Sequence, residues 1–279
     1  MVWDDVSRQG FGAMRLRDAT AGDVDRDPVA VVHAALDAGI RLVDTADAYG
    51  NEELVGRAVR GRRDEVVLAS KFGLVWHGEV ARGFDVRADR AYVRQACEAS
   101  LSRLGVDALD LYYLHHRSDE VPIEETVGAM AELVAEGKVR ELGLSNVTAE
   151  DLRQAHTVHS IAALQEQWSL TQRGIEESLL PVAAELETVV VAHSPTEHGR
   201  LHESDDGPPP MLSEIARAYD ATPGQVALAW VHHRERVHGT RVVPLPGTTS
   251  VRHVRANVAA ADLQLTDDDL RRLQGDVRG

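Results

Sequence analysis

Short apolar runs alternate with amphipathic segments along almost the whole chain, and this alternation restricts the possible fold more than any other feature. A strand buried on both faces reads as a short apolar run, and a helix that covers it reads as an amphipathic segment. Their repetition predicts parallel strands joined by helices. Seven runs fit such strands and an eighth, weaker one lies near Ser7–Ala13; the seven are Arg41–Val43, Val66–Ser70, Leu109–Leu114, Arg140–Leu144, Ala162–Leu164, Val189–Ala192 and Arg241–Leu245.

The segments between these runs carry helix boundary signals. Asp89 suits the N-cap of a helix that Gly105 ends, and Thr148 with Asp151 three residues later forms a capping box. Eight strands joined in this way predict a (β/α)8 barrel, although a doubly wound open sheet fits the strand count equally well. We expect residues 1–279 to form a single domain, because a barrel of this kind takes roughly 250 residues.

Composition excludes several classes of function. The net charge of −15 argues against binding to nucleic acid or to anionic membranes, because both need a basic face. A single cysteine, Cys97, excludes an internal disulfide and fits a reducing compartment. The chain shows no signal peptide and no apolar stretch long enough to span a membrane. We therefore expect a cytoplasmic protein.

Polar residues follow almost every predicted strand at its C-terminal end, where barrel enzymes assemble their sites. Any one of them alone would more often only open a turn. Together they favour a functional site at this end of the barrel. In chain order they are Asp44, Lys71, His115 with His116, Ser145 with Asn146, Gln165, and His193 with Ser194.

Lys71 is the most informative of these residues, because the chain contains only two lysines, Lys71 and Lys138. An ammonium on a barrel strand is costly to bury unless a carboxylate compensates it, and Asp44 ends the neighbouring strand. An ammonium beside the phenol of Tyr49 would lower the pKa of that phenol and allow it to donate a proton at neutral pH. The alternative is that Tyr49 only packs on the rim of the barrel.

The segment from Asp44 to Ala58, DTADAYGNEELVGRA, closely resembles the signature of the aldo-keto reductase family. Further stretches agree with the family in order along the chain: ASKFG, DLYYLH, GLSN, QEQWSL, VALAW and PLPGTT. The resemblance implies a barrel fold, NADPH or NADH as hydride donor, a monomer or weak homo-oligomer, and a catalytic tetrad of Asp44, Tyr49, Lys71 and His115.

In the mechanism that the resemblance implies, a hydride attacks the carbonyl carbon of a small substrate while Tyr49 protonates the alkoxide and His115 polarises the oxygen. Neighbouring strand residues face opposite ways, so only one of His115 and His116 can face inward, and the family spacing favours His115. A metal site is not expected, because adjacent histidines diverge and no further ligand has suitable spacing.

No complete Gly-x-Gly-x-x-Gly fingerprint is present, so a Rossmann dehydrogenase is not supported. The resemblance instead places the nicotinamide across the barrel mouth. It assigns the carboxamide to Ser145, Asn146 and Gln165, the stacking ring to Trp168, and the lining backbone to Gly12 and Ala13.

The phosphate-binding loops depart from the family pattern. The family commonly has Tyr-Ser-Pro-Leu-Gly-x-Gly where this chain has HSPTEHG, so Glu197 would repel a pyrophosphate unless it turns away or pairs with Arg200. His253 stands where many NADPH users have an arginine, and Arg252 could restore that charge. NADPH is the expected cofactor and NADH the alternative. The resemblance places these groups at His193, Ser194, Pro195, Gly199 and Arg200, and at Pro246, Gly247, Thr248, Arg252, His253 and Asn257.

Other functions remain open on the sequence alone. The same site could oxidise an aldose or an alcohol, since the tetrad serves both directions. A cofactor-binding regulatory subunit is a second alternative. A Schiff-base aldolase or isomerase that uses Lys71 is disfavoured, because Asp44 would raise the lysine pKa. The predicted substrate pocket consists of Phe72, Trp76 and His116, which suits a medium-sized polar or aromatic carbonyl compound.

Overall fold

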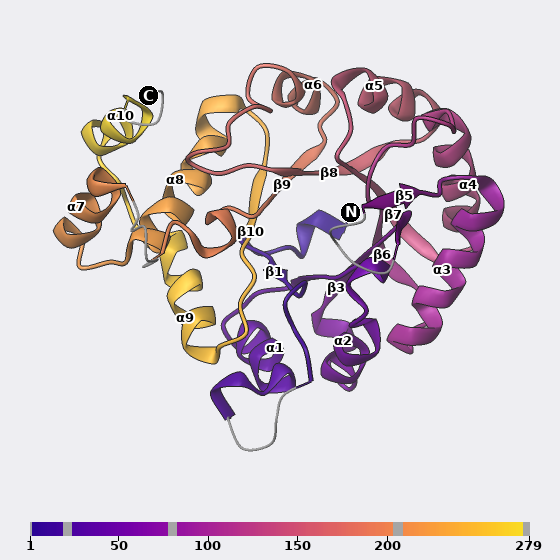
Figure 1. The fold of residues 1–279 in the computed structure, drawn as a ribbon, viewed down its shortest axis with the longest axis horizontal. Coiled ribbons are helices and arrows are strands. Elements are labelled where there is room, and N and C mark those ends of the chain that lie inside the picture. Colours follow the sequence, from indigo (N-terminus) through magenta and orange to yellow (C-terminus); the bar gives the residue numbers. More distant parts are fainter. Residues whose placement is uncertain (1, 19–23, 78–82, 203–208, 276–279) are drawn as a thin grey trace.

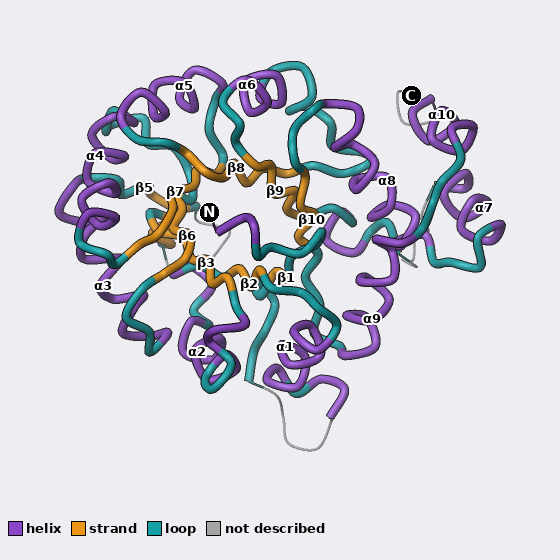
Figure 2. Tube along the Cα trace, turned by 180° about the vertical axis from the view of Figure 1, so that it is seen from behind, coloured by secondary structure: helices purple, strands orange, loops and turns teal. Residues whose placement is uncertain are grey.

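The computed structural model describes residues 2–18, 24–77, 83–202 and 209–275. Within them, eight strands form one parallel sheet in the order β1-β2-β3-β6-β7-β8-β9-β10. Gly12 pairs with Gly247, and the Gly10 N–H donates to Pro244 O at 2.9 Å, so the ring of strands in Figure 2 closes into a barrel. The order follows the chain without reversal, which confirms the barrel and excludes the doubly wound sheet. The strands are β1 Phe11–Gly12, β2 Leu42–Asp44, β3 Val67–Phe72, β6 Leu109–Leu114, β7 Val139–Ser145, β8 Ile161–Gln167, β9 Val189–His193 and β10 Val242–Leu245.

The helices surround the strands, and α7 and α10 lie together at one side of the ring (Figure 1). An antiparallel hairpin, β4 Leu74–Trp76 with β5 Phe84–Val86, follows β3 and was not predicted from the sequence. None of the described helices is long and apolar enough to cross a membrane. The helices are α1 Pro28–Asp37, α2 Glu52–Val59, α3 Arg90–Leu104, α4 Ile123–Ala135, α5 Ala149–Val158, α6 Leu179–Glu185, α7 Pro210–Ala218, α8 Pro223–His238, α9 Val251–Ala259 and α10 Asp267–Gly275.

The predicted helix boundaries are present. The Asp89 carboxylate accepts the Tyr92 N–H at 3.0 Å, and Gly105 ends α3 with a φ of 67°. Before α5, the Thr148 hydroxyl accepts the Asp151 N–H at 3.1 Å, and the Asp151 carboxylate accepts the Thr148 N–H at 2.9 Å. Each N-cap of this kind stabilises a helix by about 1 kcal/mol.

Strand alternation divides the apolar side chains between the barrel interior and the layer under the helices. Tyr113 packs inside the barrel, whereas Tyr112 packs outside it against the helices. A Cβ on Gly143 would lie 2.4 Å from the Tyr113 ring, so this glycine makes room for the ring inside the barrel. Trp3, on the 3-10 helix η1 Val2–Asp4, fills the amino-terminal end of the interior. Side chains therefore fill the barrel interior, and a ligand site can form only outside it, at an end of the barrel.

Candidate active site

A cavity of about 920 Å³ opens at the C-terminal ends of the strands. Most of the residues that the sequence singled out line it. In chain order these are Gly12, Asp44, Tyr49, Trp76, His115, Ser145, Asn146, Gln165, His193, Ser194, Pro195, Gly199, Gly247, Thr248, Arg252, His253 and Asn257.

Several lining residues were missed by the sequence reasoning. Met14 and Arg15 come from the segment after β1, Leu74 from the hairpin, and His198 from the segment after β9. They lie beyond the ends of the barrel strands, where neither periodicity nor the family motif points to them. The Arg15 guanidinium donates to His198 O at 3.0 Å, and so it joins the two sides of the cavity.

Tyr49 is carried on η3, the 3-10 turn Asp47–Tyr49 that follows β2. Gly50 ends this turn with a φ of 66°, a conformation that glycine adopts without strain. Asn51 fixes the turn because its side chain accepts the Thr45 hydroxyl at 2.7 Å and donates to Ala13 O at 2.8 Å. Ala13 itself is fully buried beside the cavity rather than lining it.

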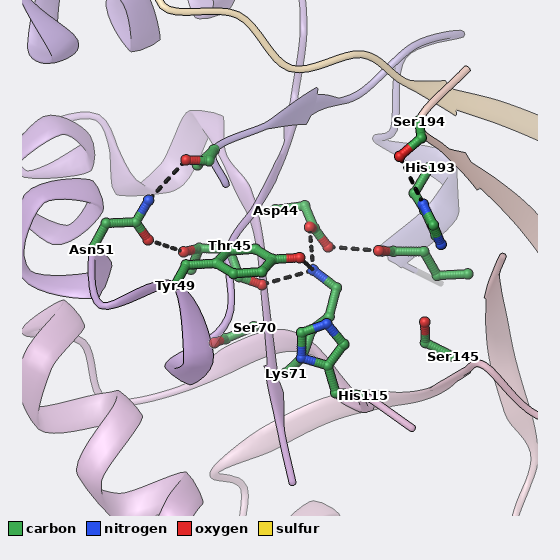
Figure 3. Close-up of polar contacts among 12 residues, drawn as sticks. Asp44, Thr45, Tyr49, Asn51, Ser70, Lys71, His115, Ser145, His193 and Ser194 are labelled. Atoms are coloured by element: carbon green, nitrogen blue, oxygen red, sulfur yellow. Dashed lines mark hydrogen bonds and ion pairs between the residues drawn. The ribbon is translucent and has the colours of Figure 1, made fainter. Parts of the chain in front are cut away.

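Lys71 lies fully buried beneath Tyr49, at the end of β3 (Figure 3). Its ammonium donates to the Asp44 carboxylate, to Thr45 O at 2.9 Å and to the Tyr49 hydroxyl at 3.4 Å. The second Asp44 oxygen accepts the Gln165 side-chain amide at 2.9 Å. The lysine therefore has a carboxylate, a carbonyl and a phenol as partners, and the carboxylate has a second donor.

The charges in this cluster follow from burial and from the ion pair. Burial by itself would lower the pKa of Lys71, but Asp44 and Tyr49 outweigh it and raise the lysine pKa. Burial raises the pKa of Tyr49, and Lys71 offsets only part of that increase. The expectation that the ammonium lowers the phenol pKa is therefore wrong in its net direction. Tyr49 keeps its proton at neutral pH.

His115 faces the cavity beside Tyr49, with the two ring centroids 5.6 Å apart at 83°. Burial, and then the Lys71 charge, hold the pKa of His115 well below its usual value, so its imidazole is neutral at neutral pH. Its buried Nδ1 has no hydrogen-bond partner among the described residues. The ring thus offers the cavity a neutral polar edge.

Ser145 ends β7 and Asn146 follows it, and both line the cavity, as His115 does. Asn146 has a φ of 54°, and its side-chain amide donates to His115 O at 2.9 Å and to the Ser145 hydroxyl at 3.0 Å. These bonds tie the end of β7 to the end of β6.

Trp168 does not lie in the cavity, contrary to the prediction that it stacks on a nicotinamide. Its indole is fully buried against Trp230 and His238 under α8, and its N–H donates to Glu176 at 3.1 Å. The ring that faces the cavity beside Gln165 is His193, which ends β9. Burial lowers the pKa of His193 to about 4, so this ring is neutral.

Two of the three predicted substrate-pocket residues also lie elsewhere. Phe72 is fully buried outside the barrel, where it stacks on Tyr112 at 4.9 Å, because it follows the inward-facing Lys71 by one residue. His116 is half-buried beside Phe84 and does not line the cavity. Trp76 does line it and is 37% exposed.

The segment after β9 contains the predicted conflict at Glu197. This residue is buried, has a φ of 53°, and its carboxylate accepts the Ser169 hydroxyl rather than pairing with Arg200. It does not line the cavity, and Arg200 is exposed outside it. The carboxylate is thus turned away from the cavity.

The far end of the cavity lies at the start of α9. Arg252 and His253 are exposed there, with the Arg252 guanidinium 3.3 Å from the His253 ring nitrogen Nε2. Pro246 is buried, and its carbonyl accepts the Gly12 N–H at 3.1 Å. No group of three His, Cys, Asp or Glu side chains in the described ranges could hold a metal ion.

Comparison with known proteins decides the family. The model of the aldo/keto reductase family matches residues 9–276. The chain belongs to this family. An aldo/keto reductase from Klebsiella pneumoniae in complex with NADP and acetate is 36% identical, with a TM-score of 0.81 over 96% of this chain and 90% of that one. A glycerol dehydrogenase from Gluconobacter oxydans is 28% identical, with a TM-score of 0.84 over 96% of this chain and 90% of that one.

This aldo-keto reductase is therefore an NAD(P)H-dependent oxidoreductase that acts on carbonyl groups. The recognition made from DTADAYG and the later motifs is confirmed, and so is the barrel.

Proposed function

We propose that this aldo-keto reductase reduces an aldehyde or ketone to an alcohol with NADPH, and that Tyr49 donates the proton. The observation that carries the proposal is the position of the Tyr49 hydroxyl. It faces the cavity, and it lies 3.4 Å from an ammonium that a buried carboxylate holds charged.

The cavity fits a nicotinamide cofactor. Its volume of about 920 Å³ is near the upper end of the usual range for ligand sites, which suits a long ligand. One end carries the Tyr49 cluster, and the other carries Arg252 and His253, which suit a phosphate-bearing group. When bound, the cofactor supplies a hydride to the carbonyl carbon.

The residues of the chain then have separate roles. Tyr49 donates its proton to the oxygen as negative charge develops there, and this completes the alcohol. Lys71 stabilises the phenolate that remains, and Asp44 keeps the lysine charged. The neutral His115 orients the carbonyl oxygen by a hydrogen bond. Together these groups replace water around the reacting oxygen.

We assign the cofactor contacts from the cavity lining. Ser145, Asn146 and Gln165 hold the carboxamide, and the ring of His193, in place of Trp168, packs on the nicotinamide. The pyrophosphate lies along the segment after β9, and the adenosine end lies beside β10 and α9. Their contacts are Ser194, Pro195, Gly199, Gly247, Thr248, Arg252, His253 and Asn257.

The reverse reaction is a second candidate. The neighbour from Gluconobacter oxydans is a glycerol dehydrogenase, and the same cluster can accept a proton from an alcohol when Tyr49 is ionised. The raised pKa of Tyr49 favours reduction at neutral pH, because the phenol holds its proton there. Initial rates in both directions with matched aldehyde and alcohol pairs separate the two.

The two directions should depend on pH in opposite ways. The donor in reduction must be protonated, and the pKa of Tyr49 lies above its ordinary value of about 10, so reduction should stay constant up to about pH 9. Oxidation should rise with pH over the same range. The exception to the constant rate of reduction is a small step near neutrality, because burial raises the pKa of Asp47, on the same turn as Tyr49, to about 7. This step in the rate of reduction should disappear in Asp47→Asn. A loss of reduction by pH 8 in that variant would contradict a donor with a raised pKa.

His253→Arg should raise the efficiency with NADPH relative to NADH about three- to tenfold, because a guanidinium adds a charged donor for the 2′-phosphate at an exposed site. Steady-state kcat/KM with each cofactor measures this ratio. His159→Arg, at the end of α5, adds the same charge far from the cavity and is the control. If the ratio of kcat/KM with NADPH to kcat/KM with NADH did not change, His253 would not be part of the phosphate site.

The function itself is tested with a panel of aldehydes, ketones and sugars, followed by the near-ultraviolet absorbance of NADPH and NADH. We expect oxidation of NADPH with at least one class of carbonyl compound. Equilibrium binding of NADPH without turnover on any member would instead favour a regulatory subunit.

A further inference from the structure

Glu166 is a buried carboxylate on β8 that the mechanism above does not use. It follows Gln165, so its side chain leaves the strand on the face opposite the cavity. Only 7% of the residue is exposed. Its Oε1 accepts the peptide N–H of Val147 at 3.0 Å, and the peptide group of Asn146, next to Val147, also lowers the pKa of the carboxyl.

The neighbours of Glu166 supply no cation within the described residues. On β9 the paired residue is Ala192, and on β8 the adjacent residues are Gln165 and Gln167. Arg117, which follows β6, is engaged by Asp151 of α5 at 2.8 Å, and burial together with the peptide groups of Val147 and Asn146 accounts for the pKa of Glu166. Burial raises the pKa of Glu166 to about 7, and the two peptide groups oppose this rise.

A buried carboxylate without a cation is costly, so the hydrogen bond that it accepts from Val147 is the notable consequence of its presence. Val147 belongs to the turn that leaves β7, together with Asn146. Asn146 adopts a φ of 54° in this turn, which is unfavourable for a residue with a side chain. The same residue bonds to His115 O and to the Ser145 hydroxyl. The carboxylate thus contacts a strained turn on the side away from the cavity, and Asn146 of the same turn lines the cavity.

We infer that Glu166 is a positioning residue: it fixes the turn at Asn146 and Val147 so that Ser145 and Asn146 face the nicotinamide carboxamide. The inference rests on the proposed function, because it takes these two residues as cofactor contacts. Without the carboxylate, the buried N–H of Val147 loses its acceptor, and the turn relaxes toward a conformation that satisfies it elsewhere. Loss of the carboxylate should therefore weaken cofactor binding much more than it slows the chemical step.

The test compares Glu166→Leu and Glu166→Gln with Glu141→Gln. Leucine removes the acceptor, and glutamine keeps a neutral one. Glu141 is a matched control on the neighbouring strand, because its carboxylate also accepts a peptide N–H, that of Val2 at 2.8 Å. The measurements are the Kd of NADP+ by titration calorimetry at pH values from about 6 to about 8, and the KM and kcat for the cofactor.

We expect Glu166→Leu to weaken NADP+ binding and raise the KM about tenfold, with kcat at saturation within about twofold of wild type. The wild-type Kd should weaken as the pH falls through about 7, because protonation removes part of the acceptor capacity. Glu166→Gln should remove that pH dependence, and Glu141→Gln should keep it.

Three results would overturn the inference. The first is an unchanged Kd in Glu166→Leu, and the second is a loss of kcat in that variant without a change in Kd. The third is a wild-type pH dependence retained in Glu166→Gln, and this result decides the matter if the leucine variant does not fold. Failure of the wild-type protein to bind either NADP+ or NAD+ would instead contradict the proposed function. A wild type that binds, with variants that match it, would contradict the inference alone.

Discussion

Replacing Tyr49 with phenylalanine should lower kcat for carbonyl reduction by about a hundredfold to ten-thousandfold, the range that a lost general acid usually costs. The phenyl ring keeps the edge contact with His115, and only the hydroxyl 3.4 Å from the Lys71 ammonium is lost. The fold and the Kd of the cofactor should therefore change little. Steady-state kinetics with the best carbonyl substrate, together with calorimetric binding of NADP+, measure both expectations.

Tyr113→Phe is the matched control for this variant. Tyr113 is a second phenol near Lys71, whose ammonium lies 6.0 Å from the centre of its ring. Its hydroxyl is fully buried inside the barrel and does not line the cavity. This variant should keep turnover within a few-fold of wild type. Equal losses in the two variants would mean that Tyr49 has no special role as proton donor.

Replacing Lys71 with methionine should have the second large effect, on both activity and stability. The variant leaves the Asp44 carboxylate buried without its cation, and removal of one partner of a buried ion pair typically destabilises a protein by about 3–5 kcal/mol. Activity should fall because nothing then stabilises the Tyr49 phenolate. Denaturant unfolding gives the free energy of unfolding, and steady-state assays give kcat.

The chain offers a direct control for Lys71, because Lys138 is its only other lysine. The Lys138 ammonium pairs with Glu98 at 2.8 Å and Glu136 at 3.1 Å near the surface, so Lys138→Met should lower the free energy of unfolding much less than Lys71→Met does. Adding Asp44→Asn to Lys71→Met should recover part of the stability but none of the activity. If Lys71→Met kept wild-type stability, the ion pair between Lys71 and Asp44 would not stabilise the site.

The strand ends were the part of the site that the sequence predicted best. Each of the residues predicted there lies at or near the C-terminal end of a barrel strand, and parallel strands in a barrel bring those ends together. They are Asp44 on β2, Lys71 on β3, His115 directly after β6 and Gln165 on β8. Residues from the segments beyond the strands, such as Met14 and Arg15, could not be found this way. Their positions depend on turn geometry and on contacts across the cavity, which no periodicity encodes.

The two misplaced aromatic residues could have been excluded from the sequence. Strand alternation places Phe72 on the outer face once Lys71 faces inward. Continued from the inward-facing Gln165, it also places Trp168 outside, and the structure buries its indole against Trp230. The same alternation places Glu166 behind the cavity. Family resemblance alone does not show on which face of a strand a side chain lies, because it matches sequence positions and not side-chain directions.

The direction of the Tyr49 pKa required the structure. Sequence reasoning considered only the ammonium beside the phenol, which lowers the phenol pKa. Burial acts in the opposite sense and is the larger effect here. The extent of burial depends on η3, on the hairpin and on His115 together, and none of these contacts can be read from the spacing of the motif.

The most direct test of the proposed function is the transfer of deuterium from NADPH that carries deuterium at both hydrogen positions of the nicotinamide C4 carbon. The labelled cofactor is mixed with the enzyme and a carbonyl substrate, and the alcohol is analysed by mass spectrometry and NMR. We predict one deuterium bound to the carbinol carbon with wild-type protein, and a strongly reduced rate of its appearance with Tyr49→Phe. Alcohol without deuterium on that carbon, or an equal rate with Tyr49→Phe, would contradict hydride transfer assisted by Tyr49.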